Sequence, residues 1–184
     1  HPYVKKAIPL AYGDNYVGFK IVGTTPDYIE KYQAKIEDGK VFDHNFEVVV
    51  GADVAEKLNL KRGDTFKGTH GSAAEGEVHD HGEYIIVGVL SRTGKVIDNL
   101  ILSNIPTVWQ MHGTHENENP KHGEEGHVDD EHEHEHHQAE MTLNEPNMEI
   151  TSVLIEFKNK MGVFMWPTLI AQNTKMQAAL PTYQ

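Results

Sequence analysis

The chain has 184 residues, and its 28 acidic and 16 basic residues give a formal net charge of −12. Residues 112–140 alone carry −9 of that charge, so the rest is nearly neutral and we expect neither nucleic acid nor anionic lipid headgroups as ligands. Cysteine is absent, which excludes disulfides, thiolate zinc sites and cysteine nucleophiles.

The first predicted elements are a strand and a helix. Residues 16–23 are rich in β-branched and aromatic side chains and alternate as a strand does. A helix is predicted to follow, because Thr25 can cap its N-terminus and Pro26 suits its first position.

Short strands joined by turns dominate the middle of the chain. Residues 46–50 have the apolar pattern of a buried strand, and Val54, Ala55 and Leu58 then recur at helical spacing. Further strands are predicted after a turn at 62–64 and in the segments GEYIIVGVLSRTG and DNLILS, and residues 105–111 are predicted as a helical turn. The pattern indicates a small β-rich lobe at residues 46–111.

The C-terminal part is predicted to repeat the order of strand and helix. The segment MEITSVLIEF alternates as a strand, and four apolar residues follow at helical spacing: Met161, Phe164, Met165 and Leu169. Pro167 is expected to kink this helix or to displace its start. The segment KMQAALP is a candidate for a returning strand. We expect the two ends of the chain to lie side by side in one α/β lobe.

No apolar run approaches the roughly 18 residues that a membrane span needs. The chain begins at His1 and Pro2, without an initiator methionine or a signal-peptide pattern. We therefore expect it to be a piece of a longer protein.

Four segments in a fixed order resemble a known family. They are VGTTPDY at 22–28, DGKVF at 38–42, GADVAEKLNLKRGD at 51–64 and IIVGVLSRTG at 85–94. In this order they resemble the extracytoplasmic (periplasmic) core domain of FtsX-like, MacB-type ABC transporter permeases. The resemblance is close over residues 17–111 and looser over residues 148–184.

The resemblance implies an α+β fold with two lobes. A porter-like βαβ lobe would be formed by both chain ends, residues 1–45 and 147–184, and the β-rich lobe of residues 46–111 would be inserted in it. Residues 112–146 would form a loop rich in histidine and acidic residues. We expect this loop to lack order, because it has almost no apolar side chains to bury.

The resemblance also implies a place and a role. The domain would lie on the periplasmic side of the cytoplasmic (inner) membrane, between two membrane helices of a permease that is expected to act as a dimer. ATP hydrolysis would belong to a cytoplasmic ABC ATPase, and this chain has no G-x-x-x-x-G-K-[ST] loop. The chain is therefore not expected to be an enzyme, but to couple ATP hydrolysis to the handling of a substrate or partner outside the membrane.

Histidines in a loop of the inserted lobe are candidate metal ligands. His79 and His81 would point to the same side of an extended segment, about 6–7 Å apart. A tetrahedral zinc site would need one or two more ligands, for which we prefer His70 and His112; Asp80 and Glu83 are alternatives. The opposing interpretation is an exposed loop without a ligand.

A second candidate lies within residues 112–140. Four histidines alternate with glutamates there: His132, His134, His136 and His137. Such a set offers imidazole and carboxylate ligands for zinc, copper or nickel, although no cofactor is required by the implied function. The opposing interpretation is a charged spacer.

Two functions of different classes therefore remain. The first is a transporter domain linked to zinc or another transition metal. The second is a protein-interaction and force-transmitting module that docks a periplasmic adaptor, lipoprotein or hydrolase and has no metal role. Exposed apolar side chains could anchor such a partner, although each is more often part of a core: Trp109, Met111, Phe164 and Trp166. An extracytoplasmic enzyme has little support, because no nucleophile-elbow or H-E-x-x-H pattern occurs.

Overall fold

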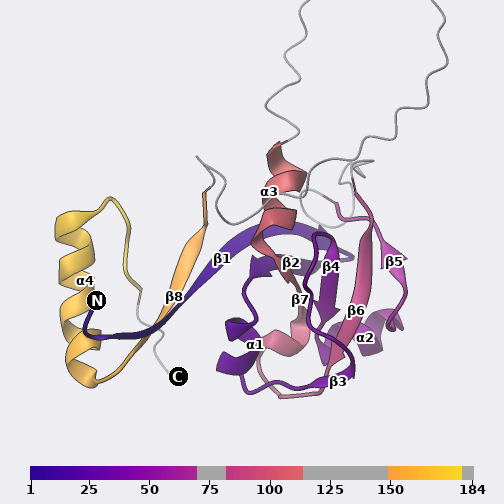
Figure 1. Cartoon of the computed structure of the whole chain (residues 1–184), viewed down its shortest axis with the longest axis horizontal. Coiled ribbons are helices and arrows are strands. Elements are labelled where there is room, and N and C mark those ends of the chain that lie inside the picture. Colours follow the sequence, from indigo (N-terminus) through magenta and orange to yellow (C-terminus); the bar gives the residue numbers. More distant parts are fainter. Residues whose placement is uncertain (70–81, 114–148, 180–184) are drawn as a thin grey trace, which may run out of the picture.

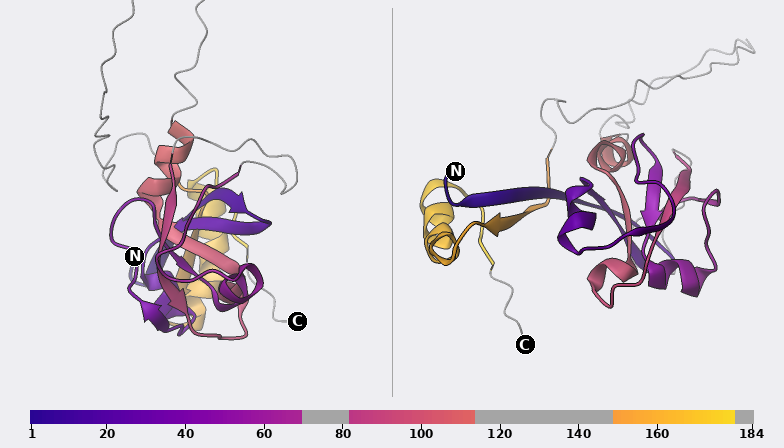
Figure 2. Two further views of the ribbon diagram at one scale, coloured as in Figure 1. Left: turned by 90° about the vertical axis from the view of Figure 1, so that its right-hand side faces the viewer. Right: turned by 60° about the horizontal axis from the view of Figure 1, so that its bottom comes forward.

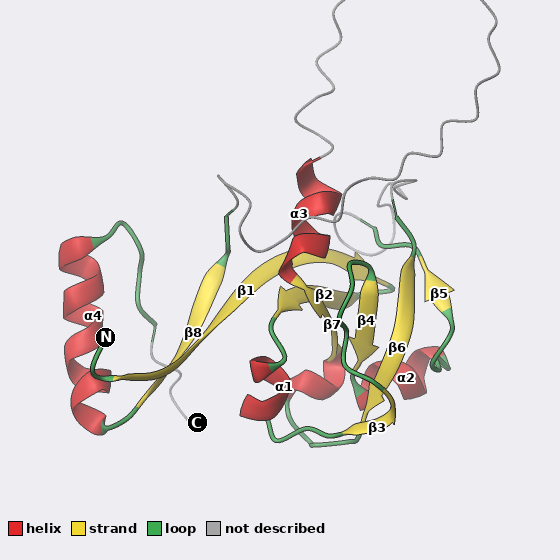
Figure 3. Ribbon diagram, in the orientation of Figure 1, coloured by secondary structure: helices red, strands yellow, loops and turns green. Residues whose placement is uncertain are grey.

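The computed structural model describes residues 1–69, 82–113 and 149–179, and of His112 and Gly113 only the backbone. The elements are β1 (Val4–Tyr16), β2 (Phe19–Thr24), α1 (Asp27–Lys31), β3 (Ile36–Gly39), β4 (Glu47–Val50), α2 (Ala52–Leu58), β5 (Thr65–Phe66), β6 (Tyr84–Leu90), η1 (Val96–Asn99), β7 (Leu100–Asn104), α3 (Ile105–Gly113), β8 (Ser152–Phe157) and α4 (Lys160–Asn173). Strands predominate among these elements (Figure 3).

All the described strands belong to one mixed sheet, in the order β3-β6-β4-β7-β2-β1-β8, and β5 pairs with β6 beside that path. The pairs β2–β7 and β4–β6 are parallel, and the other pairs are antiparallel. The fold class is therefore mixed α/β with a single sheet and few helices.

Strand β1 joins the two ends of the chain. Its residues 4–10 pair with β8 in antiparallel fashion, and its residues 11–16 pair with β2. The expectation that the first and last segments lie side by side is confirmed (Figure 1).

The central strands are apolar on both faces because each face is covered. Val49 and Leu102 lie in one core together with Tyr28 of α1. Val48 and Ile101 lie in the other core together with Val54 of α2. This double burial explains the continuous apolar runs in the sequence. A third, smaller cluster packs α3 against Ala11 of β1 through Ile105, Val108 and Trp109.

The molecule has a body and an arm. We call residues 1–8 and 149–179 the arm, which comprises β8, α4 and the start of β1; the remaining described residues are the body. The right-hand view of Figure 2 shows the arm extending away from the body, with α4 at its far end. The arm is therefore attached mainly through β1.

Most sequence-predicted elements are present. The strands β4, β6 and β7 and the helices α2 and α3 lie where they were predicted. Thr25 does not cap α1, since that helix has no side-chain cap. Pro167 lies inside α4 and does not displace its start at Lys160, which Asn159 caps by accepting a hydrogen bond from the Gly162 amide.

The returning C-terminal strand was wrong as far as the structure describes it, because residues 175–179 form no strand. Strand β1 was not predicted over its full length. Within the described residues, no helix is both long enough and apolar enough to cross a membrane.

The division into two lobes stays a prediction. Strands β2 and β3 come from residues 1–45 and pair with β7 and β6, which come from residues 46–111. The boundaries 1–45, 46–111 and 147–184 are therefore not visible as a break in the sheet, and most of residues 112–146 lies outside the described part of the chain.

Candidate functional site

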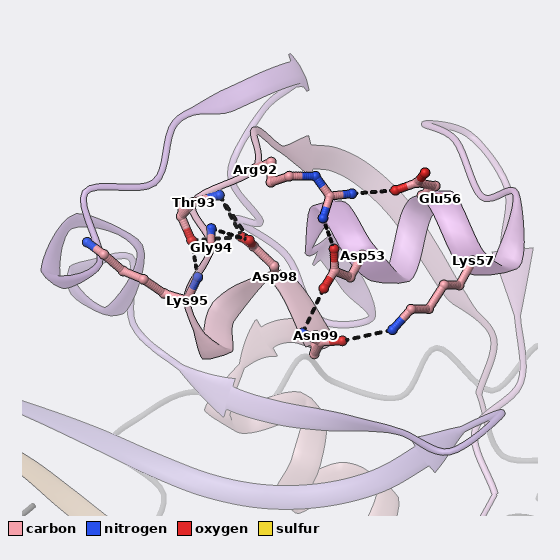
Figure 4. A network of polar contacts seen from close by, with 9 residues as sticks. All are labelled: Asp53, Glu56, Lys57, Arg92, Thr93, Gly94, Lys95, Asp98 and Asn99. Carbon is pink, nitrogen blue, oxygen red and sulfur yellow. Dashed lines mark hydrogen bonds and ion pairs between the residues drawn. The ribbon is translucent and has the colours of Figure 1, made fainter. Parts of the chain in front are cut away.

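Segments that carried the family resemblance meet at one corner of the body. Helix α2 comes from the GADVAEKL segment, and the loop after β6 comes from the SRTG segment. Figure 4 shows residues of these segments and of η1 in one polar network, which we call the polar corner: Asp53, Glu56, Lys57, Arg92, Thr93, Gly94, Lys95, Asp98 and Asn99.

A buried carboxylate shapes the loop of the polar corner. Asp98 is 1% exposed, and its oxygens accept hydrogen bonds from the backbone amides of Thr93, at 2.9 and 3.0 Å, and of Gly94, at 2.6 Å. The Thr93 hydroxyl donates a further bond of 2.8 Å. These donors hold the loop in one conformation, because a buried carboxylate must have its hydrogen bonds satisfied.

Burial and hydrogen bonding act on Asp98 in opposite directions. Burial disfavours its charge, but the bonds from Thr93 and Gly94, with the positive charge of Arg92, outweigh burial and lower its pKa. The side chain is therefore ionised at neutral pH and acts as a structural anion.

Arg92 links the loop to α2. Its guanidinium forms ion pairs with Asp53 and Glu56, which lie three residues apart on one face of the helix. The hydrogen bond and the charge of Asp53 are the main causes that raise the pKa of Arg92. The Asn99 amide also donates to Asp53, at 2.9 Å, and Lys57 donates to Asn99 at 3.3 Å.

The start of α2 fits closely against η1 because residue 51 is glycine. A Cβ at Gly51 would lie 2.3 Å from the Ile97 carbonyl oxygen and 2.4 Å from the Asp98 carbonyl oxygen. No other residue could take this place without moving η1, so Gly51 sets the distance that Arg92 spans.

A surface hollow of about 530 Å³ lies beside the polar corner, between α2, β3 and β6. It is lined by Glu37, Asp38, Ala52, Ala55, Glu56, Leu60, Lys61, Val89, Leu90 and Arg92. Asp38 also forms an ion pair with Arg62, at 3.2 Å. The hollow combines apolar side chains with charges of both signs, which suits a polypeptide better than a small apolar ligand.

The polar corner does not resemble a catalytic site. Each carboxylate drawn in Figure 4 accepts from an arginine, an amide or a hydroxyl. The lowered pKa of Asp98 is the opposite of what a general acid at neutral pH requires. The arrangement can position a surface for binding and hold it rigid.

The predicted metal ligands are not tested by the structure. The residues outside the described part of the chain are His70, His79, Asp80, His81, His132, His134, His136 and His137. His112 belongs to α3, but only its backbone is described. Glu83 is described, and its carboxylate accepts a hydrogen bond of 2.8 Å from the Thr65 hydroxyl. Among the described residues, no three histidine or acidic side chains form a group that could hold a metal ion.

The points where both histidine-bearing segments join the body border elements that contact one another. A Cβ on Gly82 would lie 2.4 Å from the Phe46 ring, and the Phe46 amide donates to Thr107 of α3 at 2.9 Å. The Trp109 indole, in the middle of α3, donates to the Glu149 carbonyl oxygen at 2.7 Å. The residues before β6 and the start of the arm segment are therefore both linked to α3.

The four residues that organise the polar corner, Asp53, Glu56, Arg92 and Asp98, were missed by sequence reasoning. The segments that contain the first three were recognised only as markers of resemblance. The i, i+3 spacing of the two acids on α2 was a usable signal for a basic partner. Which base would meet them depends on the sheet order, and no local pattern gives that.

Comparison with known proteins supports the fold. No protein-family model and no curated protein matches this sequence. Among the solved structures that are similar to this chain are three transporter domains. The extracellular domain of the ABC-type transporter YknZ from Gram-positive bacteria has a TM-score of 0.51 at 12% identity and covers 92% of this chain and 76% of its own. The periplasmic region of MacB from Actinobacillus actinomycetemcomitans has a TM-score of 0.40 at 18% identity, and the match covers 59% of this chain and 51% of the MacB chain. A permease domain from Porphyromonas gingivalis has a TM-score of 0.40 at 14% identity, and the match covers 56% of this chain and 47% of the Porphyromonas chain.

The fold is that of an extracytoplasmic domain of ABC-type transporters. It is shared with the YknZ domain over nearly the whole chain, and the resemblance predicted from the sequence segments is confirmed at the level of the fold. This chain spans only about half the length of the MacB and Porphyromonas structures.

Proposed function

We propose that this chain is the extracytoplasmic domain of an ABC transporter permease, held on the periplasmic side of the cytoplasmic membrane. The observation that carries the proposal is the fold shared with the YknZ extracellular domain over 92% of the chain. In this role the domain hydrolyses no ATP itself. It passes the movement caused by a cytoplasmic ATPase to a substrate or partner outside the membrane, and the whole transporter acts as a dimer.

The arrangement of β1 supports a coupling role. One strand of 13 residues pairs with β8 in the arm and with β2 in the body. A displacement of the arm is therefore carried into the sheet of the body without crossing a loop. Lys6 adds a polar link, because it bonds to Asp27 and Glu30 of α1 at 2.7 and 2.9 Å.

The experiment is to purify the whole permease from its own membranes through an affinity tag. We expect an ATP-hydrolysing subunit to copurify, and its ATPase activity to change when Asp98→Asn loosens the body while the subunit remains bound. A preparation with no ATP-hydrolysing subunit would contradict the proposal.

The hollow beside the polar corner favours a protein partner for this domain, such as a periplasmic adaptor, lipoprotein or hydrolase. Its lining includes Glu37, Glu56, Lys61 and Arg92, a set of charges that a folded or extended polypeptide can match. We expect Lys61→Glu to weaken capture of that partner from envelope extract and Lys35→Glu to leave it unchanged. Capture that requires a metal and ignores Lys61 would contradict this proposal.

A role for zinc or another transition metal is a separate proposal. Its support is the His79-x-His81 spacing and the contacts through Phe46 that link Gly82, which follows one histidine-bearing segment, to α3, which precedes the other. Titration calorimetry should show zinc binding that weakens between about pH 7.5 and 5.5, as imidazoles become protonated. Two variants, His79→Ala with His81→Ala and a deletion of residues 112–140, would show how much of the heat of zinc binding each histidine-bearing segment contributes. No heat above buffer would remove the metal role.

A further inference from the structure

Helix α4 exposes an apolar face at the far end of the arm. Phe164 is 75% exposed, Met161 57% and Met165 40%, and with Thr168 these residues share one side of the helix. Two of the four side chains expected to anchor a partner, Trp109 and Met111, belong to α3 and are instead buried. Three of the exposed large apolar side chains therefore lie together on α4: Met161, Phe164 and Met165.

The opposite face of α4 is already covered. Gly162 is buried, and a Cβ there would lie 2.6 Å from the Phe157 ring of β8. The Trp166 ring makes edge contacts with Phe157 and His1, with centroid distances of 5.6 and 4.9 Å. Since β8 and the N-terminus occupy this side, the face with Phe164 is the one left open, and the right-hand view of Figure 2 shows α4 at the end of the arm far from the body.

The charge around α4 has the opposite sign to the charge of the chain. Residues 157–184 contain no acidic residue, although the chain has 28. The arm holds five lysines and two glutamates, a formal charge of +3 in a protein of net −12. Lys158, Lys160 and Lys175 lie at the two ends of the helix, and within the described residues these three form no ion pair. The net charge of the whole chain does not reveal this local excess of lysine. The expectation that anionic lipid headgroups are not ligands was based on that net charge, so it does not hold for the arm.

We propose that the open face of α4 binds the surface of an anionic phospholipid membrane. Binding of a peripheral segment to such a surface depends on the apolar area that it buries and on attraction between its basic residues and anionic lipid, and α4 with its flanking lysines offers both. At 14 residues, α4 is shorter than the roughly 20 that a spanning helix needs. A second copy of the chain suits this face less well, because it would bring two sets of unpaired lysines together. The inference rests on the proposed function, which keeps the domain beside a membrane.

The test is sedimentation of the 184-residue chain with lipid vesicles. We expect it to bind phosphatidylcholine vesicles that contain about one third phosphatidylglycerol, and to bind pure phosphatidylcholine at least about tenfold more weakly. Raising the salt from about 0.05 to about 0.5 M should release it. Phe164→Ser should reduce binding about tenfold, and so should Lys158→Glu with Lys160→Glu.

Matched controls lie on the body. Val96 is 54% exposed on η1, and Lys20 and Lys35 are exposed, so Val96→Ser and the pair Lys20→Glu with Lys35→Glu should leave vesicle binding unchanged. Circular dichroism checks that each variant is folded, which is expected because every substituted side chain is exposed.

Two results would overturn the inference. One is no binding to either vesicle, or binding that the Phe164 and lysine variants do not change. The other is self-association that depends on protein concentration and is abolished by Phe164→Ser, while the chain does not bind vesicles. This result would assign the face to contact with a second copy of the chain. Either result leaves the proposed function standing if the whole permease still copurifies with its ATPase, so the two failures are distinguishable.

Discussion

The body and the arm use the same kinds of element but differ in how they are stabilised. In the body, Val48, Val49 and Val50 of β4 are all completely buried, because helices cover both faces of the sheet. In the arm, every residue of β8 is only half-buried, and α4 keeps one apolar face open. The body is therefore stable through its own packing, whereas the arm depends on β1 and on whatever covers α4.

The largest expected effect compares two leucines. Leu102 in β7 is completely buried, and Leu154 in β8 is half-buried. We expect Leu102→Ala to lower the free energy of unfolding by about 3 kcal/mol, through lost burial and a cavity. Leu154→Ala should cost about 1 kcal/mol. Urea denaturation measures both, and equal losses would show that arm and body are packed equally well.

The next effect concerns the anion inside the body. Asp98→Asn replaces a carboxylate oxygen, which accepts hydrogen bonds, by an NH2 group. This donor would face the backbone N–H groups of Thr93 and Gly94, which are also donors. We expect a loss of about 2 kcal/mol in the free energy of unfolding. Asp43→Asn is the control, because Asp43 is exposed and its carboxylate should contribute little. An Asp98 variant as stable as the wild type would mean that the loop after β6 is held by its backbone alone.

The pH dependence of stability should follow the same residue. The pKa of Asp98 is lower in the folded protein, so its contribution is complete above the ordinary aspartate value of about 4 and is lost as the pH falls through the folded value. Glu47 acts in the same direction: burial alone would raise its pKa, but the bonds from Lys40 and from two backbone amides together outweigh burial and lower the pKa. The difference between wild type and Asp98→Asn should shrink between about pH 5 and pH 2. A constant difference would show that charge is not involved.

The smallest effect tests the polar link between arm and body. Lys6 bonds to Asp27 and Glu30, which raise its pKa to about 12, but all three side chains are at least partly exposed. We expect Lys6→Met to leave the unfolding midpoint nearly unchanged, because exposed ion pairs contribute little. Amide hydrogen exchange in β8 should become faster while β7 is unaffected. Faster exchange throughout the body would show that the link stabilises both regions.

The same difference explains what the sequence could predict. The strands at 47–50, 84–90 and 100–104 were recognisable because double burial makes them continuously apolar. Strand β1 was not, because it changes partner near Leu10 and contains Pro9 and Gly13, which interrupt any alternation. The described part of the predicted strand in KMQAALP, residues 175–179, pairs with none of the described strands.

The polar corner shows a second limit of sequence reasoning. Asp53 and Arg92 are 39 positions apart and meet because β4, β6 and η1 bring α2 and the loop together. Local patterns cannot supply such a pairing. For the histidines the situation is the opposite. Their spacing can be recognised in the sequence, but the described residues do not test whether they bind a metal.

The partner exchange of β1 also decides how the molecule would respond to tension. Because the strand is bonded to β8 over its first half and to β2 over its second, a pull applied through β8 along the strand axis loads both ladders in shear, so many hydrogen bonds resist at once. A pull perpendicular to the strand would instead peel the bonds one by one. The connection between arm and body through β1 should therefore resist force along the strand axis better than force perpendicular to it.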